Sequence, residues 1–306
     1  MSVITEHDVV GDARERLGSV GVWLGALLGV TADVERPAAR RIEELGFGSI
    51  FVGERIGGKE AMAHQAVLLA ATDHIVMGTG IANVWSRHPA AMQGGAATLG
   101  DAYPGRFVLG VGVSHAVMVD NSGLAYEKPL AHMARYLDDM AASAPLGPEP
   151  RVPVPHLLAA LRPRMLELAR TSTDGAHPYF VPPSHTPLAR EVLGPDKLLV
   201  PEQAVVLASD PDTARRVARQ HMSTYLGLPN YVNNLRHLGF TDDDLADGGS
   251  DRLVDAIVAW GDETAIATRV TEHLDGGADH VLLQPLGDLD RAMAQLEVLA
   301  PALLGT

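Results

Sequence analysis

The 306-residue sequence contains no cysteine. Without a thiol the chain can have no disulfide framework, no thiolate nucleophile and no cysteine-based metal site. Hydrophobic residues nevertheless make up 46% of the chain, which is ample for the core of a globular protein. The 13 histidines are scattered and show no His-Glu-x-x-His pattern, so we expect no metal site.

Positive charge is also scarce. The chain has 24 Lys and Arg residues against 38 Asp and Glu residues, a formal net charge of −14, and only three of the basic residues are lysines. A field of this sign repels nucleic acid unless basic residues cluster, and no basic run is present. An anionic ligand would therefore be bound locally, by a few arginines and by the amino termini of helices.

Long hydrophobic runs are missing as well. No uninterrupted apolar segment approaches the roughly 20 residues that a membrane-spanning helix requires. The first 18 residues are polar and charged, unlike a secretory signal or a membrane anchor. We therefore expect a cytoplasmic protein that does not bind membranes.

What the sequence does contain is an alternation of short apolar segments and helix-like segments. The apolar segments read as strands buried on both faces of a parallel sheet, after a frayed leader before residue 18. The expected strands are 18–24, 49–52, 75–77, 107–109, 154–160, 176–181, 198–207 and 280–283. This pattern predicts an α/β protein with one domain, residues 1–306, folded as a single (β/α)8 TIM barrel with helical insertions. A doubly wound open sheet is the alternative.

The segment 75–115 is the most informative part of the chain. It holds two short apolar segments that end in Gly78-Thr79-Gly80 and in Gly110-Val111-Gly112, with a helix-like segment between them. This is a β-α-β unit whose strands should be parallel. Glycines at the ends of two parallel strands would let a flat cofactor ring lie against bare backbone.

The same segment resembles the bacterial-luciferase-like family, and most closely its branch that uses the deazaflavin coenzyme F420. The resemblance lies in residues 78–83, 86–89, 96–99, 105–107 and 109–112, in their order and spacing. It extends over most of the chain and is poorest at 118–150 and 227–260. It implies a luciferase-like barrel, non-covalently bound F420, hydride transfer between the deazaflavin and a small organic substrate, and a homodimer.

The resemblance also implies which residues bind the cofactor. Gly80, Ile81, Ala82 and Asn83 match a strand bulge that carries a non-proline cis peptide bond behind the ring, placed here at Gly80-Ile81. An ordinary tight turn with Asn83 in a left-handed conformation is the alternative. The other expected contacts are Gly112, Val113 and Ser114 beside the ring, Ala160, Leu161 and Arg162 toward the anionic tail, and His177 at the end of the sixth strand.

Two residues are candidates for catalysis. His115 follows Ser114 where a related F420-dependent dehydrogenase carries a catalytic acid, and an imidazole could exchange a proton with a substrate oxygen near neutral pH. A loop histidine bonded to backbone is the alternative. Glu54, at the end of the second strand, could support His115 or orient the substrate, or it could form an ion pair with Arg55.

Other functions fit less well. Neither glycine pair completes the Gly-x-Gly-x-x-Gly pattern of a Rossmann dehydrogenase, because Asn83 and His115 occupy the third glycine position. Gly112-Val113-Ser114 lacks the second glycine of a hydrolase nucleophile elbow. An FMN-dependent monooxygenase and a barrel that binds a flavin or deazaflavin without turnover both remain open as alternatives.

Overall fold

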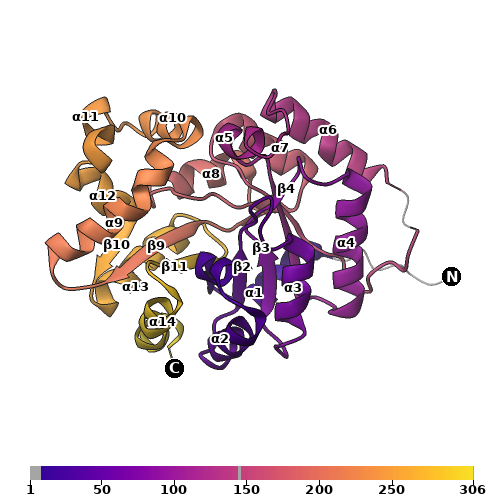
Figure 1. Ribbon diagram of the computed structural model, residues 1–306, viewed down its shortest axis with the longest axis horizontal. Coiled ribbons are helices and arrows are strands. Elements are labelled where there is room, and N and C mark those ends of the chain that lie inside the picture. Colours follow the sequence, from indigo (N-terminus) through magenta and orange to yellow (C-terminus); the bar gives the residue numbers. More distant parts are fainter. Residues whose placement is uncertain (1–7, 144–145, 306) are drawn as a thin grey trace.

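The protein is described by a computed structural model that covers residues 8–143 and 146–305. It is an α/β fold in which a curled, all-parallel sheet is surrounded by helices (Figure 1). The strands are β1 (Val20–Trp23), β2 (Ser49–Val52), β3 (Val76–Thr79), β4 (Ala82–Asn83), β5 (Phe107–Gly112), β6 (His156–Leu158), β7 (Gly175–Ala176), β8 (Leu198–Leu199), β9 (Glu202–Leu207), β10 (Val258–Gly261) and β11 (Val281–Pro285).

Helices follow most of the strands, as the alternation in the sequence predicts. The α-helices are α1 (Val9–Leu17), α2 (Ala32–Glu44), α3 (Ala61–Leu69), α4 (Pro89–Ala102), α5 (Ala116–Asp120), α6 (Pro129–Ala141), α7 (Pro163–Ser172), α8 (His185–Leu193), α9 (Pro211–Leu226), α10 (Pro229–His237), α11 (Asp242–Leu245), α12 (Asp251–Ile257), α13 (Glu263–Asp275) and α14 (Leu289–Leu304). Two 3₁₀ helices, η1 (Gly25–Gly29) and η2 (Ala246–Gly248), complete the described elements. None of the helices within the described residues is long and apolar enough to cross a membrane.

Hydrogen bonds join the strands in the order β10-β9-β11-β1-β2-β3-β5-β6-β7-β8, and β4 pairs with β5. Every pair is parallel, so the carboxyl ends of the strands meet at one end of the sheet. The main core lies between the sheet and the surrounding helices, and it is built largely from Leu, Ile, Val and Ala. A second, smaller core lies beneath α9, α10 and α12.

The amino-terminal leader differs from the prediction. Residues 1–7 lie outside the described residues, but the chain from Val9 onward forms α1 rather than a frayed segment. Asp8 caps its first turn, and Ala13 and Leu17 pack against Val108 among the amino-terminal parts of the strands. The sequence signal for α1 is the helical spacing of its apolar residues, such as Ala13 and Leu17, and the charged residues between them make this signal weak. This helix covers the end of the sheet opposite to the carboxyl ends.

Two strands also differ from the prediction. The sixth strand was expected at 176–181, but β7 ends at Ala176, and the chain beyond it passes to the end of the sheet. No strand was expected between 207 and 280, but Val258–Gly261 form β10, which pairs with β9. Val258 and Ala259 are buried between α12 and α13. A four-residue stretch can therefore form a strand where the open edge of β9 is available for pairing.

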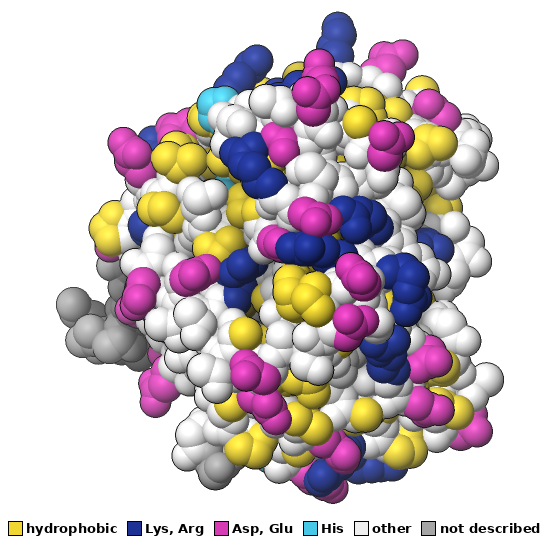
Figure 2. Space-filling model, turned by 90° about the vertical axis from the view of Figure 1, so that its left-hand side faces the viewer, with side chains coloured by type: hydrophobic (Ala, Val, Ile, Leu, Met, Phe, Trp, Pro, Cys, Tyr) yellow, Lys and Arg dark blue, Asp and Glu magenta, His cyan; other side chains and the backbone are white. Residues whose placement is uncertain are grey.

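The outer face around α9 and α12 carries charges of both signs. Arg215 pairs with Asp251 and Asp255, and Arg219 pairs with Asp251. Figure 2, which shows this side of the molecule, has basic and acidic side chains interleaved, with hydrophobic side chains scattered between them. Exposed pairs of this kind add little stability individually, but they prevent a surface of one sign from forming here.

Candidate functional site

A cavity of about 970 Å³ opens at the carboxyl ends of the strands. Its size is within the range of small-molecule and cofactor sites. One wall consists of strand ends and the turns that follow them, and the facing wall is formed by α9, α10 and the segment after β7. Of the predicted site residues, the cavity is lined by Glu54, Gly80, Ile81, Val113, Ser114, His115, Ala160, Leu161 and His177.

The peptide bond between Gly80 and Ile81 is cis, at the position that the family resemblance implies. The chain continues directly into β4, where Ala82 pairs with Val111 and Asn83 pairs with Gly112. Asn83 is therefore extended, and the alternative of a tight turn with a left-handed Asn83 is wrong. Ala82 and Asn83 are buried behind the surface of the cavity rather than lining it.

The glycines of this region serve contacts within the protein. A Cβ atom on Gly110 would lie 2.0 Å from the carbonyl oxygen of Thr79, and one on Gly112 would lie 2.6 Å from Cγ1 of Ile81. A Cβ on Gly80 would lie 2.4 Å from Nε1 of Trp23. These glycines therefore allow close packing of neighbouring strands and side chains, in addition to any access they give to a ligand.

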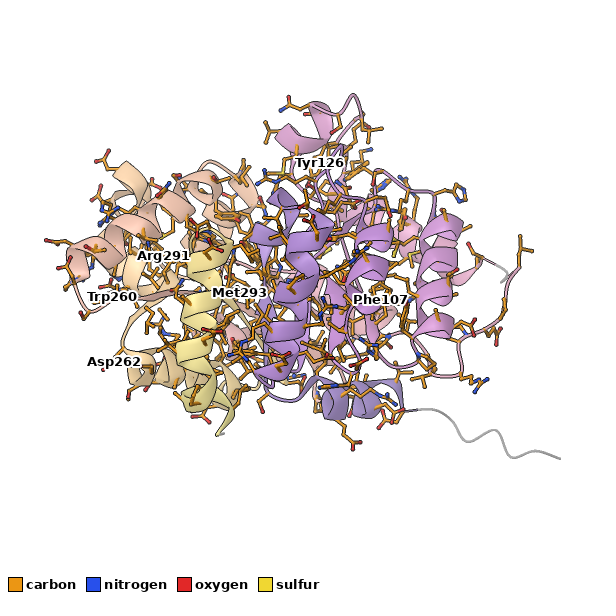
Figure 3. The ribbon with its side chains drawn as sticks, turned by 60° about the horizontal axis from the view of Figure 1, so that its bottom comes forward. Phe107, Tyr126, Trp260, Asp262, Arg291 and Met293 are labelled. Atoms are coloured by element: carbon orange, nitrogen blue, oxygen red, sulfur yellow. The ribbon has the colours of Figure 1, made fainter. Side chains whose placement is uncertain are left out.

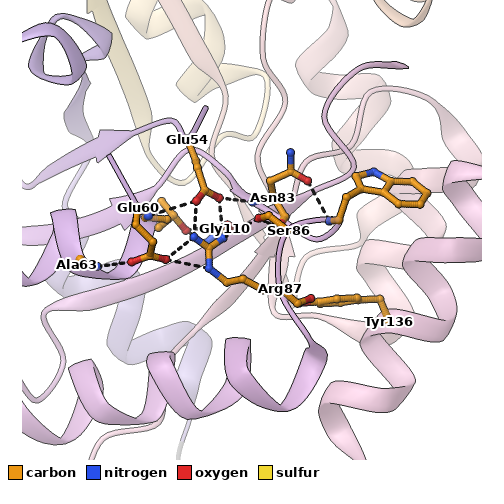
Figure 4. A network of polar contacts seen from close by, with 11 residues as sticks. Glu54, Glu60, Ala63, Asn83, Ser86, Arg87, Gly110 and Tyr136 are labelled. Carbon is orange, nitrogen blue, oxygen red and sulfur yellow. Dashed lines mark hydrogen bonds and ion pairs between the residues drawn. The ribbon is translucent and has the colours of Figure 1, made fainter. Parts of the chain in front are cut away.

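Glu54 is the centre of a polar network that holds this wall (Figure 4). Its side chain is only 5% exposed and forms a two-pronged ion pair with Arg87, one arm of which is 2.6 Å long. Its two oxygens also accept hydrogen bonds from the backbone amides of Asn83, at 2.7 Å, and of Ala61, at 3.3 Å. The carboxylate is thereby fully occupied, by Arg87 rather than by Arg55.

Arg87 is held just as firmly. It also pairs with the carboxylate of Glu60, and its backbone carbonyl accepts a hydrogen bond of 2.9 Å from the hydroxyl of Tyr136. Burial lowers the pKa of the Arg87 guanidinium, but the bonds to Glu54 and Glu60 outweigh this and raise the pKa above its ordinary value. We call Glu54, Arg87 and the segment 80–83 the braced wall. Among the residues that the structure describes, no hydrogen bond links Glu54 to His115.

His115 lies beyond the end of β5, after Ser114 in a left-handed conformation, and it occupies the N-cap position of α5. Its Nδ1 atom is 3.1 Å from Oδ1 of Asn230, and its ring is 5.2 Å from the ring of Tyr231. Burial lowers the pKa of the imidazole, and the hydrogen bond to Asn230 opposes that shift only in part. The alternative of a loop histidine bonded to backbone does not hold, because its partner is a side chain from α10.

The facing wall is aromatic. The rings of Tyr179, Tyr225 and Tyr231 lie 5.3 to 6.2 Å apart, and we call these three residues together with His221 the aromatic wall. The hydroxyl of Tyr179 donates to Oε1 of Gln284 at 2.8 Å, so the bond of 2.7 Å between the two tyrosine hydroxyls must be donated by Tyr225. Burial raises the pKa values of all three tyrosines, which keeps them protonated.

Several buried polar atoms around the cavity have no partner within the described residues. Nδ1 of His177 is 2.7 Å from the carbonyl oxygen of Val200, which can only accept, so the hydrogen of the neutral ring is on Nδ1. Its Nε2 atom is unpartnered, as is Nε2 of His221. Burial lowers the pKa of each imidazole to about 4. Unsatisfied buried groups cost free energy, and they are typical of a site that binds a ligand.

The arginines at the cavity differ from those expected. Arg162 is exposed at the N-cap of α7 and lies outside the cavity lining, although Ala160 and Leu161 belong to it. The arginines that line the cavity are Arg55, Arg216 and Arg291, the last on the first turn of α14 (Figure 3). Their guanidinium groups make no hydrogen bond or ion pair with any described residue, so they are available to an anionic ligand.

Reasoning from the sequence missed the aromatic wall, Asn230, Arg216 and Arg291, and it considered Arg55 only as a possible partner of Glu54. One signal was present: Arg216, Gln220, His221 and Tyr225 recur at helical spacing and so share a face of α9. The sequence does not say that this face meets a cavity. Within the described residues, no group of three or more His, Asp or Glu side chains is arranged to hold a metal ion.

Comparisons with known proteins agree with this architecture. A family model for the luciferase-like monooxygenases matches residues 24–280. The F420-dependent glucose-6-phosphate dehydrogenase of Beutenbergia cavernae is 28% identical over 184 residues, which cover 48% of this chain and 55% of that protein. The chain spans about half the length, or less, of the curated relatives it matches.

Solved structures share the fold over almost the whole chain. An F420-dependent secondary alcohol dehydrogenase in complex with an F420-acetone adduct superposes with a TM-score of 0.74 at 17% identity, covering 93% of this chain and 98% of that one. The oxygenating constituent of a type II Baeyer-Villiger monooxygenase from Pseudomonas putida, in complex with FMN, gives 0.67 at 13% identity, covering 92% and 96%. At these identities the similarity concerns the fold alone.

Proposed function

The chain belongs to the luciferase-like monooxygenase family, and from this premise we propose that it is an F420-dependent oxidoreductase acting on a small organic substrate. When bound, the deazaflavin would supply the hydride acceptor or donor. The curated relatives that the chain matches include F420-dependent dehydrogenases, which supports this branch of the family. An FMN-dependent monooxygenase is the second candidate, supported by a solved structure of the same fold in complex with FMN.

The observation that carries the proposal is the braced wall facing a cavity of cofactor size. The cis Gly80-Ile81 segment presents backbone and a single aliphatic side chain to the cavity, and Glu54 holds the segment by accepting a hydrogen bond from the amide of Asn83. A flat tricyclic ring fits such a surface. The unpartnered Nε2 of His177 offers an acceptor to a ring N–H or a sugar hydroxyl, and the free arginines at the cavity suit an anionic tail.

The chain's own residues then have distinct roles. Ile81 would contact one side of the ring, and Val113 and Ser114 would contact the other. Ala82, Asn83 and Gly112 would support these contact residues from within the sheet. The tail would run toward Ala160 and Leu161, where the first amides of α7 and the exposed Arg162 lie nearby. His115 would exchange a proton with a substrate oxygen, and Glu54 would act by holding the braced wall.

We also infer that the curled sheet closes into the predicted (β/α)8 barrel. Only Val200 and Pro201 separate β8 from β9. Strand β8 pairs with β7, and strand β9 pairs with β11. The amide of Val200 bonds to Ala176, and the carbonyl of Pro201 accepts from Leu282, so residues 198–207 would act as one strand that joins both edges. The homodimer, the cytoplasmic location and the absence of membrane and nucleic-acid partners stay predictions.

Turnover tests the proposal. The protein is incubated with oxidised F420 and a panel of small alcohols, and with reduced F420 and the corresponding carbonyl compounds and alkenes, while F420 absorbance is followed. We expect one substrate class to change the absorbance in a protein-dependent manner, with His115→Gln slower by about 100-fold. Turnover only with reduced FMN and oxygen would instead assign the chain to the monooxygenases.

A further inference from the structure

A polar side chain from the least family-like part of the sequence, that of Asn230, contacts the proposed acid/base residue. Asn230 lies in the first turn of α10, directly after Pro229, and 115 positions separate it from His115. The two side chains meet because α5 and α10 lie beside each other above the carboxyl ends of the strands (Figure 1). Both residues line the cavity, so their contact is part of its wall.

The chemistry of the contact fixes which nitrogen of the imidazole carries hydrogen. Oδ1 of Asn230 is an amide oxygen and can only accept, so Nδ1 of His115 must be the donor across the 3.1 Å between them. A neutral imidazole with its hydrogen on Nδ1 has its lone pair on Nε2. Nε2 of His115 makes no hydrogen bond with any other described residue, so that lone pair is available to a molecule in the cavity.

We propose that Asn230 is a positioning residue for His115: it holds the imidazole in the Nδ1–H tautomer and so makes Nε2 the base that receives a proton from the substrate. This inference rests on the proposed function and narrows it to a substrate with a hydroxyl group on a carbon that bears hydrogen. The proton of the hydroxyl group would go to Nε2, the hydride of the C–H bond would leave with its electron pair to the oxidised F420 of the proposed function, and a carbonyl group would remain. The imidazolium formed is stabilised by the oxygen of Asn230.

The surroundings of His115 favour the neutral ring from which this step begins. The ring packs against Tyr231 of α10, whose own pKa is raised by burial, so that side chain stays uncharged. Burial lowers the pKa of His115, and the hydrogen bond to Asn230 opposes that shift. Ser114, its neighbour in the chain, faces Met118 rather than the imidazole. Asn230 is thus the polar group that decides the tautomer.

The tautomer can be measured without knowledge of the substrate. Long-range ¹⁵N–¹H correlation spectra of the cofactor-free, ¹⁵N-labelled protein distinguish a protonated from an unprotonated ring nitrogen, and His115→Gln assigns the signals. We expect unprotonated Nε2 in the wild type. In Asn230→Leu we expect a mixture of tautomers, and in Asn230→Asp a pKa raised by the adjacent carboxylate. Asn233→Asp adds the same charge to an exposed position of α10 and should leave the His115 signals unchanged.

The result that would overturn the proposal is an Nε2–H tautomer in the wild type, or His115 spectra that are the same in Asn230→Leu as in the wild type. F420 affinity, measured on the same samples, keeps the two proposals apart. A confirmed tautomer without F420 binding would reject the proposed function alone, whereas F420 binding with the wrong tautomer would reject only the role of Asn230.

Once a substrate is identified, Asn230→Leu should lower kcat about tenfold at unchanged KM, and Asn230→Asp should move the acidic limb of the pH profile to higher pH.

Discussion

The braced wall and the aromatic wall face the same cavity but are built on opposite principles. In the braced wall the carboxylate of Glu54 is saturated with donors, and strands pack so closely that single methyl groups would collide. In the aromatic wall the hydroxyls of Tyr225 and Tyr179 form one chain of hydrogen bonds that ends at Gln284, and the Nε2 atom of His221 has no partner among the described residues. A fixed surface suits a cofactor that is always the same. A less satisfied surface on helices suits a variable substrate.

The largest contrast is expected from glycine substitutions. Gly110→Ala directs a methyl group at the carbonyl oxygen of Thr79, 2.0 Å away, and backbone cannot move aside as a side chain can. We expect a loss of about 3 kcal/mol or more in the free energy of unfolding, measured by urea denaturation. Gly94→Ala, on the exposed side of α4 where a Cβ meets nothing within 4 Å, should stabilise by about 0.5–1 kcal/mol. Equal midpoints for the two variants would contradict tight packing of β5 against the end of β3, from which the braced wall continues.

The next effect concerns the ion pair in the braced wall. Glu54→Gln leaves Arg87 buried without its two-pronged partner and turns an amide NH₂ toward existing donors. We expect about 3 kcal/mol of destabilisation in urea and F420 affinity at least tenfold weaker. Glu60→Gln alters the half-exposed partner of the same arginine, with its side chain 49% exposed, and should cost less than about 1 kcal/mol. If both variants bound F420 equally well, Glu54 would not support the cofactor surface.

A pH effect probes the buried interior beside the aromatic wall. Burial raises the pKa of Glu202 to about 8 from an ordinary value of 4.5, so the folded state holds a proton that the unfolded state has lost. The stabilisation that protonated Glu202 gives to the folded state is complete below pH 4.5, and it is lost as the pH rises through 8. Between pH 6.5 and 8 the free energy of unfolding should fall by about 2 kcal/mol in the wild type and stay level in Glu202→Gln.

That pH window avoids the buried histidines. Burial lowers the pKa values of His177 and His221 to about 4, so their neutral forms stabilise the fold above pH 6.5, and that stability is lost as the pH falls toward 4. Thermal or urea denaturation at several pH values separates the two effects. A wild type and a Glu202→Gln variant with parallel profiles from pH 6.5 to 8 would mean that Glu202 is ionised in the folded protein.

The smallest effect is expected in the aromatic wall itself. Tyr225→Phe removes the donor to Tyr179 and keeps the ring, which should cost about 1 kcal/mol of stability. F420 affinity should not change, whereas the KM of a substrate that contacts this wall should. Isothermal titration with F420 and steady-state kinetics measure the two effects. A loss of F420 affinity as large as in Glu54→Gln would mean that the cofactor lies on the aromatic wall.

The same contrast decides how much could be predicted from the sequence. The glycine spacing at 78–80 and 110–112 is a local pattern that the sequence shows directly, and the cis Gly80-Ile81 bond was predicted from the family resemblance. The role of Glu54 in the braced wall was not predicted, because it depends on a contact with Arg87, which is 33 positions away. The aromatic wall joins a segment after β7 to a helical insertion, and periodicity shows that α9 has two faces without showing which one meets a cavity. The contact of His115 with Asn230 depends on that docking, so no local pattern announces it.

The most direct measurement is the equilibrium binding of F420 and of FMN to the cofactor-free protein, side by side, by fluorescence quenching, with Glu54→Gln and Glu60→Gln as paired variants. The account predicts tight binding of F420, negligible binding of FMN, and weakening of F420 binding by Glu54→Gln alone. Preference for FMN, or no binding of either molecule, would contradict the account.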